Sequence, residues 1–244
     1  MVIEQPIIHD RHIVKEQFQK LKANGELKFK KPDNLTIATC RNSGTLEDRI
    51  IPHLSGYEQT SILEENMKYL GLDLVVLRDD RLPWRNTFKF EMLHNYLNSG
   101  ECTTEYFMCC DAIDVIFVDD PQRVIDIFKS FECDALFMST HSRDGYNCMV
   151  EVKGKVDQIN DYNSRYMNSG VYIGKTSFIK ELIAKAMEYA IPHGVTMGEY
   201  REYLESKPED YPRGSQDQDI FRYMEPDFYP RLRVDYNNQM AYRS

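Results

Sequence analysis

Two aspartates, Asp111 and Asp114, stand three residues apart directly after the apolar run Tyr106–Cys110. Such a run predicts a strand that is buried on both faces of a sheet. Ionised carboxylates at the end of a buried strand cost several kcal/mol unless they are paired, hydrated or metal-bound. Because residues 102–122 contain no Lys or Arg, we expect the two aspartates to hold a hard cation such as Mn²⁺ or Mg²⁺. The alternative is a pair of solvated aspartates in a chain with 39 acidic residues.

Strands and helices are predicted to alternate around this motif from residue 34 onward. The pattern indicates an α/β fold with a mixed, mostly parallel sheet flanked by helices, and ligands of such sheets bind at the carboxyl ends of the strands. Gly71 is the expected end of one helix, and Asp120 with Pro121 is the expected start of another. The predicted strands are 35–39, 74–77, 106–110, 135–138 and 171–173, and the predicted helices are 62–70, 88–97, 121–128, 182–190 and a short one at 220–224.

Residues 1–33 differ in character from the rest of the chain. A polar helix is expected from Asp10 to Asn24, followed by a linker at 28–32. We therefore predict an N-terminal extension over residues 1–33 and one catalytic domain over residues 34–244.

The composition narrows the class of protein. A hydrophobic content of 42% predicts an ordinary globular domain, and a net charge of -9 disfavours a duplex-DNA binder. A phosphorylated ligand remains compatible with this charge if a divalent cation accompanies it. The first residues lack the apolar core of a signal peptide, and no apolar stretch approaches the ~18 residues of a membrane span. These features predict a cytoplasmic location.

Four motifs occur in a fixed order across residues 35–240, and together they resemble one known family. They are Phe88–Leu93, Tyr106–Phe117, Arg165–Gly174 and Ser215–Phe221. In this order they resemble the glycosyltransferase domain of procollagen lysyl hydroxylases, which has the GT-A fold. The resemblance implies a metal-dependent transfer of a sugar from a nucleotide-diphosphate sugar, above all a UDP-sugar, to a hydroxyl acceptor. That acceptor is a glycan, a protein or a modified nucleobase.

The resemblance also implies roles for individual residues. Those implied to hold Mn²⁺ or Mg²⁺ are Asp111 and Asp114. Asp217, Gln218 and Asn168 are implied at the reaction centre. The residues implied to bind the donor are Thr39 beside the uridine, Arg41, Trp84, Arg85, Lys89 near the phosphates, and Ser169 with Gly170 in a turn beside the sugar.

Each of these residues also has a plainer interpretation. Asn168–Gly170 could be an ordinary turn, and Lys89 could lie on a solvated helix face. Trp84 could be a core anchor, and Asp217 could simply favour the start of a helix.

The chain departs from the family in two places. The family has a metal-binding histidine near its C-terminal end, whereas no histidine follows His193 here. The third protein ligand is therefore expected to be missing or different, with Asp235 as a weak candidate. Ile113 also stands where the family has an aromatic residue, so the preference for uridine is less certain.

Two other functions stay open at this stage. A nucleotidyltransferase would need a glycine-rich loop after the first strand, and Cys40–Gly44 contains one glycine. A non-catalytic module that binds a nucleotide sugar or a glycan would be consistent with the absent C-terminal histidine.

Overall fold

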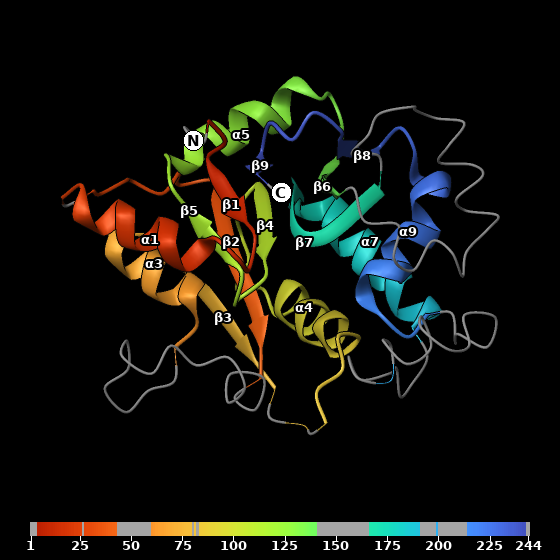
Figure 1. Cartoon of the computed structure of the whole chain (residues 1–244). Coiled ribbons are helices and arrows are strands. Elements are labelled where there is room, and N and C mark those ends of the chain that lie inside the picture. The colour runs from red at the N-terminus through yellow and green to blue at the C-terminus, as the bar shows by residue number, and fades with distance from the viewer. Residues whose placement is uncertain are drawn as a thin grey trace.

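The computed structural model describes residues 4–25, 27–42, 60–79, 81, 83–140, 166–190, 199 and 214–242. A six-stranded sheet in the order β3-β2-β4-β7-β6-β8 forms the centre (Figure 1). Its strands are β2 (Leu35–Arg41), β3 (Val75–Arg78), β4 (Tyr106–Cys110), β6 (Ala135–Thr140), β7 (Tyr166–Lys175) and β8 (Leu232–Asp235).

The sheet is mixed, with parallel pairing in the majority. β2 runs parallel to β3 and β4, and β6 runs parallel to β8, whereas β7 is antiparallel to both of its neighbours. Parallel strands need crossover connections, and helices supply them here. The predicted α/β class with a mixed, mostly parallel sheet flanked by helices is confirmed.

Helices cover both faces of the sheet. The helices on one face are α4 (Phe88–Asn98), α7 (Thr176–Tyr189) and α9 (Asp217–Phe228), and those on the other are α3 (Ile62–Leu70) and α5 (Pro121–Ser130). α3 begins with a capping box between Ser61 and Glu64 and ends at Gly71, whose φ of 71° lies in the left-handed region. The predicted stop at Gly71 and start at Asp120 are confirmed. The helix predicted as short at 220–224 is wrong in length, because α9 has 12 residues.

A small second sheet connects the two ends of the described chain. It has the order β5-β1-β9 and consists of β1 (Ile7–His9), β5 (Val115–Phe117) and β9 (Ala241–Tyr242). β1 pairs antiparallel with β5 and parallel with β9. Figure 1 shows β1 and β5 side by side in front of the central sheet.

The N-terminal segment packs against this body. Beyond β1, helix α1 (Val14–Ala23) buries Val14 and Phe18 in a cluster with Ile62 and Ile116. Three strand residues and the apolar face of α1 thus stabilise the domain. The boundary between residues 33 and 34 stays a prediction.

Candidate metal and donor site

The two aspartates lie where β4 ends, as the sequence predicts. The backbone N–H of Asp111 donates to the carbonyl of Gly170 on the neighbouring strand at 2.8 Å. A tight turn then carries the chain into β5, and Asp114 is the last residue before that strand. Their side chains retain 30% and 21% exposure, so an ion could reach both carboxylates from solvent.

A histidine that the sequence reasoning missed faces both carboxylates. His9 Nε2 lies 3.8 Å from Asp111 Oδ2 and 3.5 Å from Asp114 Oδ1. One ligand atom from each of the three residues falls within 4.8 Å of the others, and this is the metal-capable group found among the described residues. The apolar pair Ile7-Ile8 before His9 was the available signal for a short strand, but nothing in the sequence shows that β1 pairs with β5.

The residues present fit a divalent ion. One imidazole nitrogen and two carboxylate oxygens are ligands that Mn²⁺ accepts. Gly170 leaves the space for the imidazole, because a Cβ at this position would lie 2.5 Å from His9 Nε2 and 2.9 Å from Asn168 Oδ1. A side chain of any other residue type at position 170 would therefore displace the histidine.

Asp235, the candidate third ligand, has a different role. Its Oδ2 accepts a hydrogen bond from the backbone N–H of Met240 at 2.7 Å, and its side chain is fully buried on β8. Burial raises the pKa of this carboxyl above its usual range. Asp235 thus organises the turn after β8 and is absent from the group that His9 forms with the two aspartates.

Lys89 bridges two carboxylates of the site, so the solvated-face interpretation is wrong. Its Nζ lies 2.8 Å from Asp111 Oδ1 and 2.9 Å from Asp217 Oδ2. Burial by itself lowers the pKa of Lys89, but the two adjacent carboxylates outweigh it and hold the pKa well above the usual range. The lysine therefore stays positively charged at the point where donor phosphates are expected.

Asp217 points into the site although it opens a helix. It is the first residue of α9, and its carboxylate accepts from Lys89 and from Ser169 Oγ at 3.3 Å. The N-cap of this helix is Gln216, which makes no side-chain capping bond. Because Asp217 is only 4% exposed, its charge is directed at Lys89 and Ser169.

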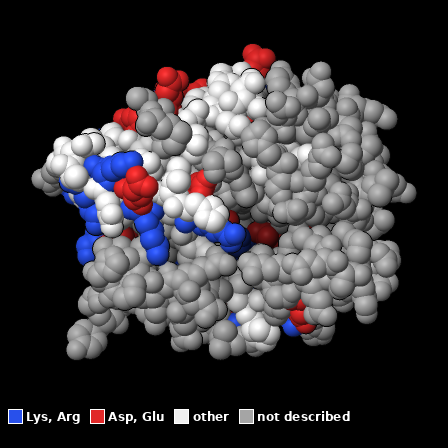
Figure 2. Space-filling model, viewed as in Figure 1, with Lys and Arg blue, Asp and Glu red and all other residues white. Residues whose placement is uncertain are grey.

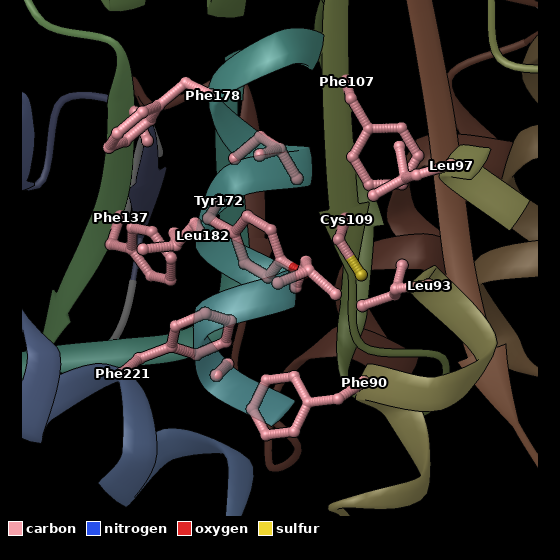
Figure 3. Close-up of a cluster of buried hydrophobic side chains, with 14 of the residues drawn as sticks. Phe90, Leu93, Leu97, Phe107, Cys109, Phe137, Tyr172, Phe178, Leu182 and Phe221 are labelled. Carbon is pink, nitrogen blue, oxygen red and sulfur yellow. The ribbon is translucent and has the colours of Figure 1, made fainter. Parts of the chain in front are cut away.

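The apolar core beneath the site sets the distance between Lys89 and Asp217. Phe90 of α4 and Phe221 of α9 meet edge to face with their centroids 5.2 Å apart. Phe221 also packs on Tyr172 and Phe137, whose rings are stacked at 4.6 Å (Figure 3). The packing of these rings fixes the two helix starts side by side.

Asn168, Ser169 and Gly170 lie within β7, so the predicted turn is corrected. The register between β6 and β7 shifts at this point, because Phe137 pairs with Tyr172 whereas Met138 pairs with Asn168. Asn168 Oδ1 accepts from the N–H of Gly170 at 2.8 Å within the irregularity. Such a bulge re-aims side chains, and here it directs Ser169 toward Asp217.

Gln218 follows Asp217, and its side chain faces Arg222 of the same helix. With its side-chain oxygen toward the guanidinium, Gln218 accepts from Arg222 Nη2 at 2.9 Å. Arg222 is fully buried and donates from Nε to the carbonyl of Met167. Gln218 therefore connects α9 to the irregular part of β7.

The predicted donor residues on β2 are Thr39 and Arg41. Thr39 is fully buried and donates to the carbonyl of Cys110 at 2.7 Å, which ties β2 to β4 beneath the site. Arg41 is 3% exposed and its Nε lies 2.6 Å from Glu64 Oε1 of α3. Both side chains are thus engaged within the protein.

The Trp84–Arg85 pair precedes α4. Trp84 packs against the core cluster below the site, and its indole N–H donates to Asn86 at 3.0 Å. The Arg85 guanidinium lies 3.6 Å from Glu199. The core-anchor interpretation of Trp84 agrees with this packing, and a donor role for either residue stays a prediction.

Figure 2 shows basic side chains on the side of α1 and α3, with an acidic one among them. Near the centre, an acidic side chain is set back in a hollow next to a basic one. A small recess at the site is lined by Lys89, Asp111, Ser169, Tyr172 and Asp217, among others. Among the described residues, no helix is long and apolar enough to cross a membrane.

Carboxylates and a half-buried lysine thus lie together at the carboxyl edge of an α/β sheet, which is where such sheets bind their ligands. The family described as PLOD GT domain matches residues 53–190, more than half of the chain. The chain belongs to this family of glycosyltransferase domains and is a glycosyltransferase. This assignment decides against a nucleotidyltransferase and a purely binding module.

Solved glycosyltransferase structures resemble the chain at low identity. Mouse xyloside xylosyltransferase 1 in its apo form is 12% identical, with 83% of this chain and 85% of that chain covered and a TM-score of 0.45. A glycosyltransferase involved in the glycosylation of the major capsid of PBCV-1 is 13% identical, with 82% and 80% covered and a TM-score of 0.39. No curated protein matches the chain.

Proposed function

We propose that this glycosyltransferase is metal-dependent and moves a sugar from a UDP-sugar to a hydroxyl acceptor. The observation that carries the proposal is the convergence of ligand atoms at the end of β4. Asp111, Asp114 and His9 each offer one ligand atom within 4.8 Å of the others. Lys89 lies beside them, in contact with Asp111 and Asp217, so a divalent ion and an ammonium group would together face the donor diphosphate.

Asp111 and Asp114 would hold the ion. A divalent ion at such a position supplies positive charge against the leaving diphosphate. Asp111 already shares one oxygen with Lys89 and turns the other toward His9, so both of its oxygens are directed into the site. Lys89 would then donate to a phosphate oxygen as a point charge.

Asp217 and the residues of β7 would act on the sugar and the acceptor. Asp217 is held at the base of the recess by Lys89 and Ser169. From there its carboxylate could accept a hydrogen bond from a sugar hydroxyl, orient the acceptor or take its proton. Asn168 and Gln218 would set the shape of the sugar subsite through their contacts with Gly170 and Arg222.

A donor-consumption assay tests the proposal. The full chain is incubated with a panel of UDP-sugars and Mn²⁺, and free sugar, UDP and glycosylated acceptors are measured by mass spectrometry. We expect consumption of one or a few UDP-sugars that stops with a chelator and with Asp111→Asn. Consumption that is equal with and without the chelator would show that the reaction does not depend on a metal. Consumption of other nucleotide sugars only would show that the donor is not a UDP-sugar.

A further inference from the structure

The position of His9 is fixed by backbone pairing to the metal motif itself. β1 is antiparallel to β5, the strand that begins directly after Asp114, and His9 pairs with Val115. The N–H of Asp10 also donates to the carbonyl of Asp114 at 3.0 Å. The histidine therefore cannot shift along the strand without breaking the hydrogen bonds that follow the second aspartate.

The distances suit a shared ion better than a direct contact. A charge-assisted hydrogen bond between an imidazolium and a carboxylate is about 2.7–2.9 Å long, and His9 Nε2 lies farther away, 3.5 and 3.8 Å from the two oxygens. Adjacent ligand atoms about 2.1 Å from one ion are roughly 3 Å apart. The three ligand atoms, all within 4.8 Å of one another, therefore need only side-chain adjustments to share one coordination sphere.

The surroundings hold the imidazole facing the carboxylates. The His9 side chain is 5% exposed, and its Nε2 and Cε1 occupy the space that a Cβ at position 170 would fill. The strand that supplies this glycine also accepts the backbone N–H of Asp111. One glycine therefore determines the placement of both the histidine and the first aspartate.

We infer that His9 is the third protein ligand of the metal held by Asp111 and Asp114. This inference rests on the proposed function. The third ligand then comes from the N-terminal strand, and a neutral imidazole with Nε2 toward the ion is the coordinating form. β1 is consequently part of the metal site, and its pairing with β5 assembles it.

Binding of Mn²⁺ to the full chain, followed by EPR without nucleotide, tests the inference. We expect His9→Gln to weaken Mn²⁺ binding by at least about tenfold. The matched control is His12→Gln, a surface histidine three residues away, and it should leave the affinity within about twofold of wild type. Pulsed EPR adds a structural readout: a ¹⁴N coupling from a coordinated imidazole should be present in wild type and in His12→Gln and absent in His9→Gln.

Gly170→Ala tests the same contact from the opposite strand. The added methyl group would overlap His9 Nε2 at 2.5 Å, so Mn²⁺ binding should weaken in the same direction while both aspartates are retained. Thermal unfolding of each metal-free variant reports whether it is folded. If His9→Gln does not fold, Gly170→Ala and the ¹⁴N coupling of wild type decide the matter.

The outcomes separate the inference from the function on which it rests. If Asp111→Asn abolishes Mn²⁺ binding but His9→Gln binds within twofold of wild type, the inference about His9 is overturned and the metal site stands. A ¹⁴N coupling that persists in His9→Gln would assign the ligand to another histidine. If Asp111→Asn also binds Mn²⁺ like wild type, the proposed metal site itself is wrong.

Discussion

Two ionic clusters lie at the carboxyl ends of the neighbouring strands β2 and β4, and they are built differently. At the end of β2, Arg41 Nε lies 2.6 Å from Glu64 Oε1, and the Arg78 guanidinium of β3 lies 3.8 Å from Glu64 Oε2. At the end of β4, Lys89 is in contact with Asp111 and Asp217, and Asp114 adds a third carboxylate beside His9. In the first cluster two guanidinium groups face one carboxylate, whereas in the second three carboxylates gather around one ammonium group and a histidine.

The difference separates a structural ion pair from a binding site. A buried guanidinium that pairs with a carboxylate is neutralised within the protein, and removing the carboxylate leaves an uncompensated charge. Carboxylates that gather in one place repel one another until a cation binds between them. Such a cluster lowers the stability of the ion-free protein and raises its affinity for a cation.

Glu64→Gln should have the largest effect, which is a loss in the free energy of unfolding. Arg41 is 3% exposed, and without the carboxylate its charge is left buried, at a cost of about 3 kcal/mol in the free energy of unfolding. Glutamine can still serve the capping box with Ser61, so the loss reports the ion pair. Chemical denaturation measures it.

The control is Glu65→Gln, which removes a carboxylate of the same helical turn that accepts from Thr60. It should cost much less than Glu64→Gln, and neither variant should change Mn²⁺ affinity by more than about twofold. Equal losses of unfolding free energy in the two variants would show that the ion pair between Arg41 and Glu64 adds nothing to stability.

Asp217→Asn should reduce turnover by at least ~100-fold, which corresponds to about 2.7 kcal/mol of transition-state stabilisation. The affinity for UDP should change by less than about threefold, because Lys89 keeps its contact with Asp111. Asp227→Asn, an exposed aspartate on the same helix, serves as the control with normal turnover. Near-normal turnover of Asp217→Asn with a melting temperature lower by ~5 °C would make Asp217 a purely structural residue.

Asp235→Asn should have the smallest effect. Burial raises the pKa of Asp235, so the folded state binds this proton more tightly than the unfolded state does. Stability therefore falls as the pH rises from the ordinary carboxyl pKa through the raised one, and above the raised pKa the wild type bears that whole cost. The variant keeps an oxygen for the Met240 N–H and should be as stable as wild type or more stable at pH 7, by about 1 kcal/mol or less.

Unfolding curves of the two proteins at pH 4 and pH 7 check this, since the difference should shrink at the lower pH. The affinity for Mn²⁺ should be unchanged. A clear loss of metal binding would return Asp235 to the list of ligands.

The sequence predicted the parts of the site that lie on long, regular elements. The buried strand before Asp111 has five apolar residues, and the helix ending at Gly71 has helical spacing with a glycine stop, so each carries its own local signal. Family membership and the glycosyltransferase class followed from four such motifs. These features depend on neighbouring residues and need no knowledge of the fold.

The missed features depend on contacts between distant parts of the chain. β1 has three residues and β9 has two, too few for a periodic pattern, and Ile7 pairs with Phe117 and Ala241. Without that pairing His9 looks like one more residue of a polar N-terminal segment. The irregularity of β7 likewise has no distinct local signal, since an Asn-Ser-Gly sequence suits a turn as well as a bulge.

The central claim is that the cluster at the end of β4 binds the nucleotide through a divalent ion. Calorimetry of UDP binding to the full chain, with Mn²⁺ and then with a chelator, tests it most directly, with Asp111→Asn as the comparison. Two phosphates cannot approach Asp111 and Asp114 unscreened, so we predict that UDP binds wild type with Mn²⁺ and at least about tenfold more weakly with the chelator. Asp111→Asn should bind UDP with Mn²⁺ as weakly as it binds UDP with the chelator. Equal affinity of wild type for UDP in both conditions would contradict the account.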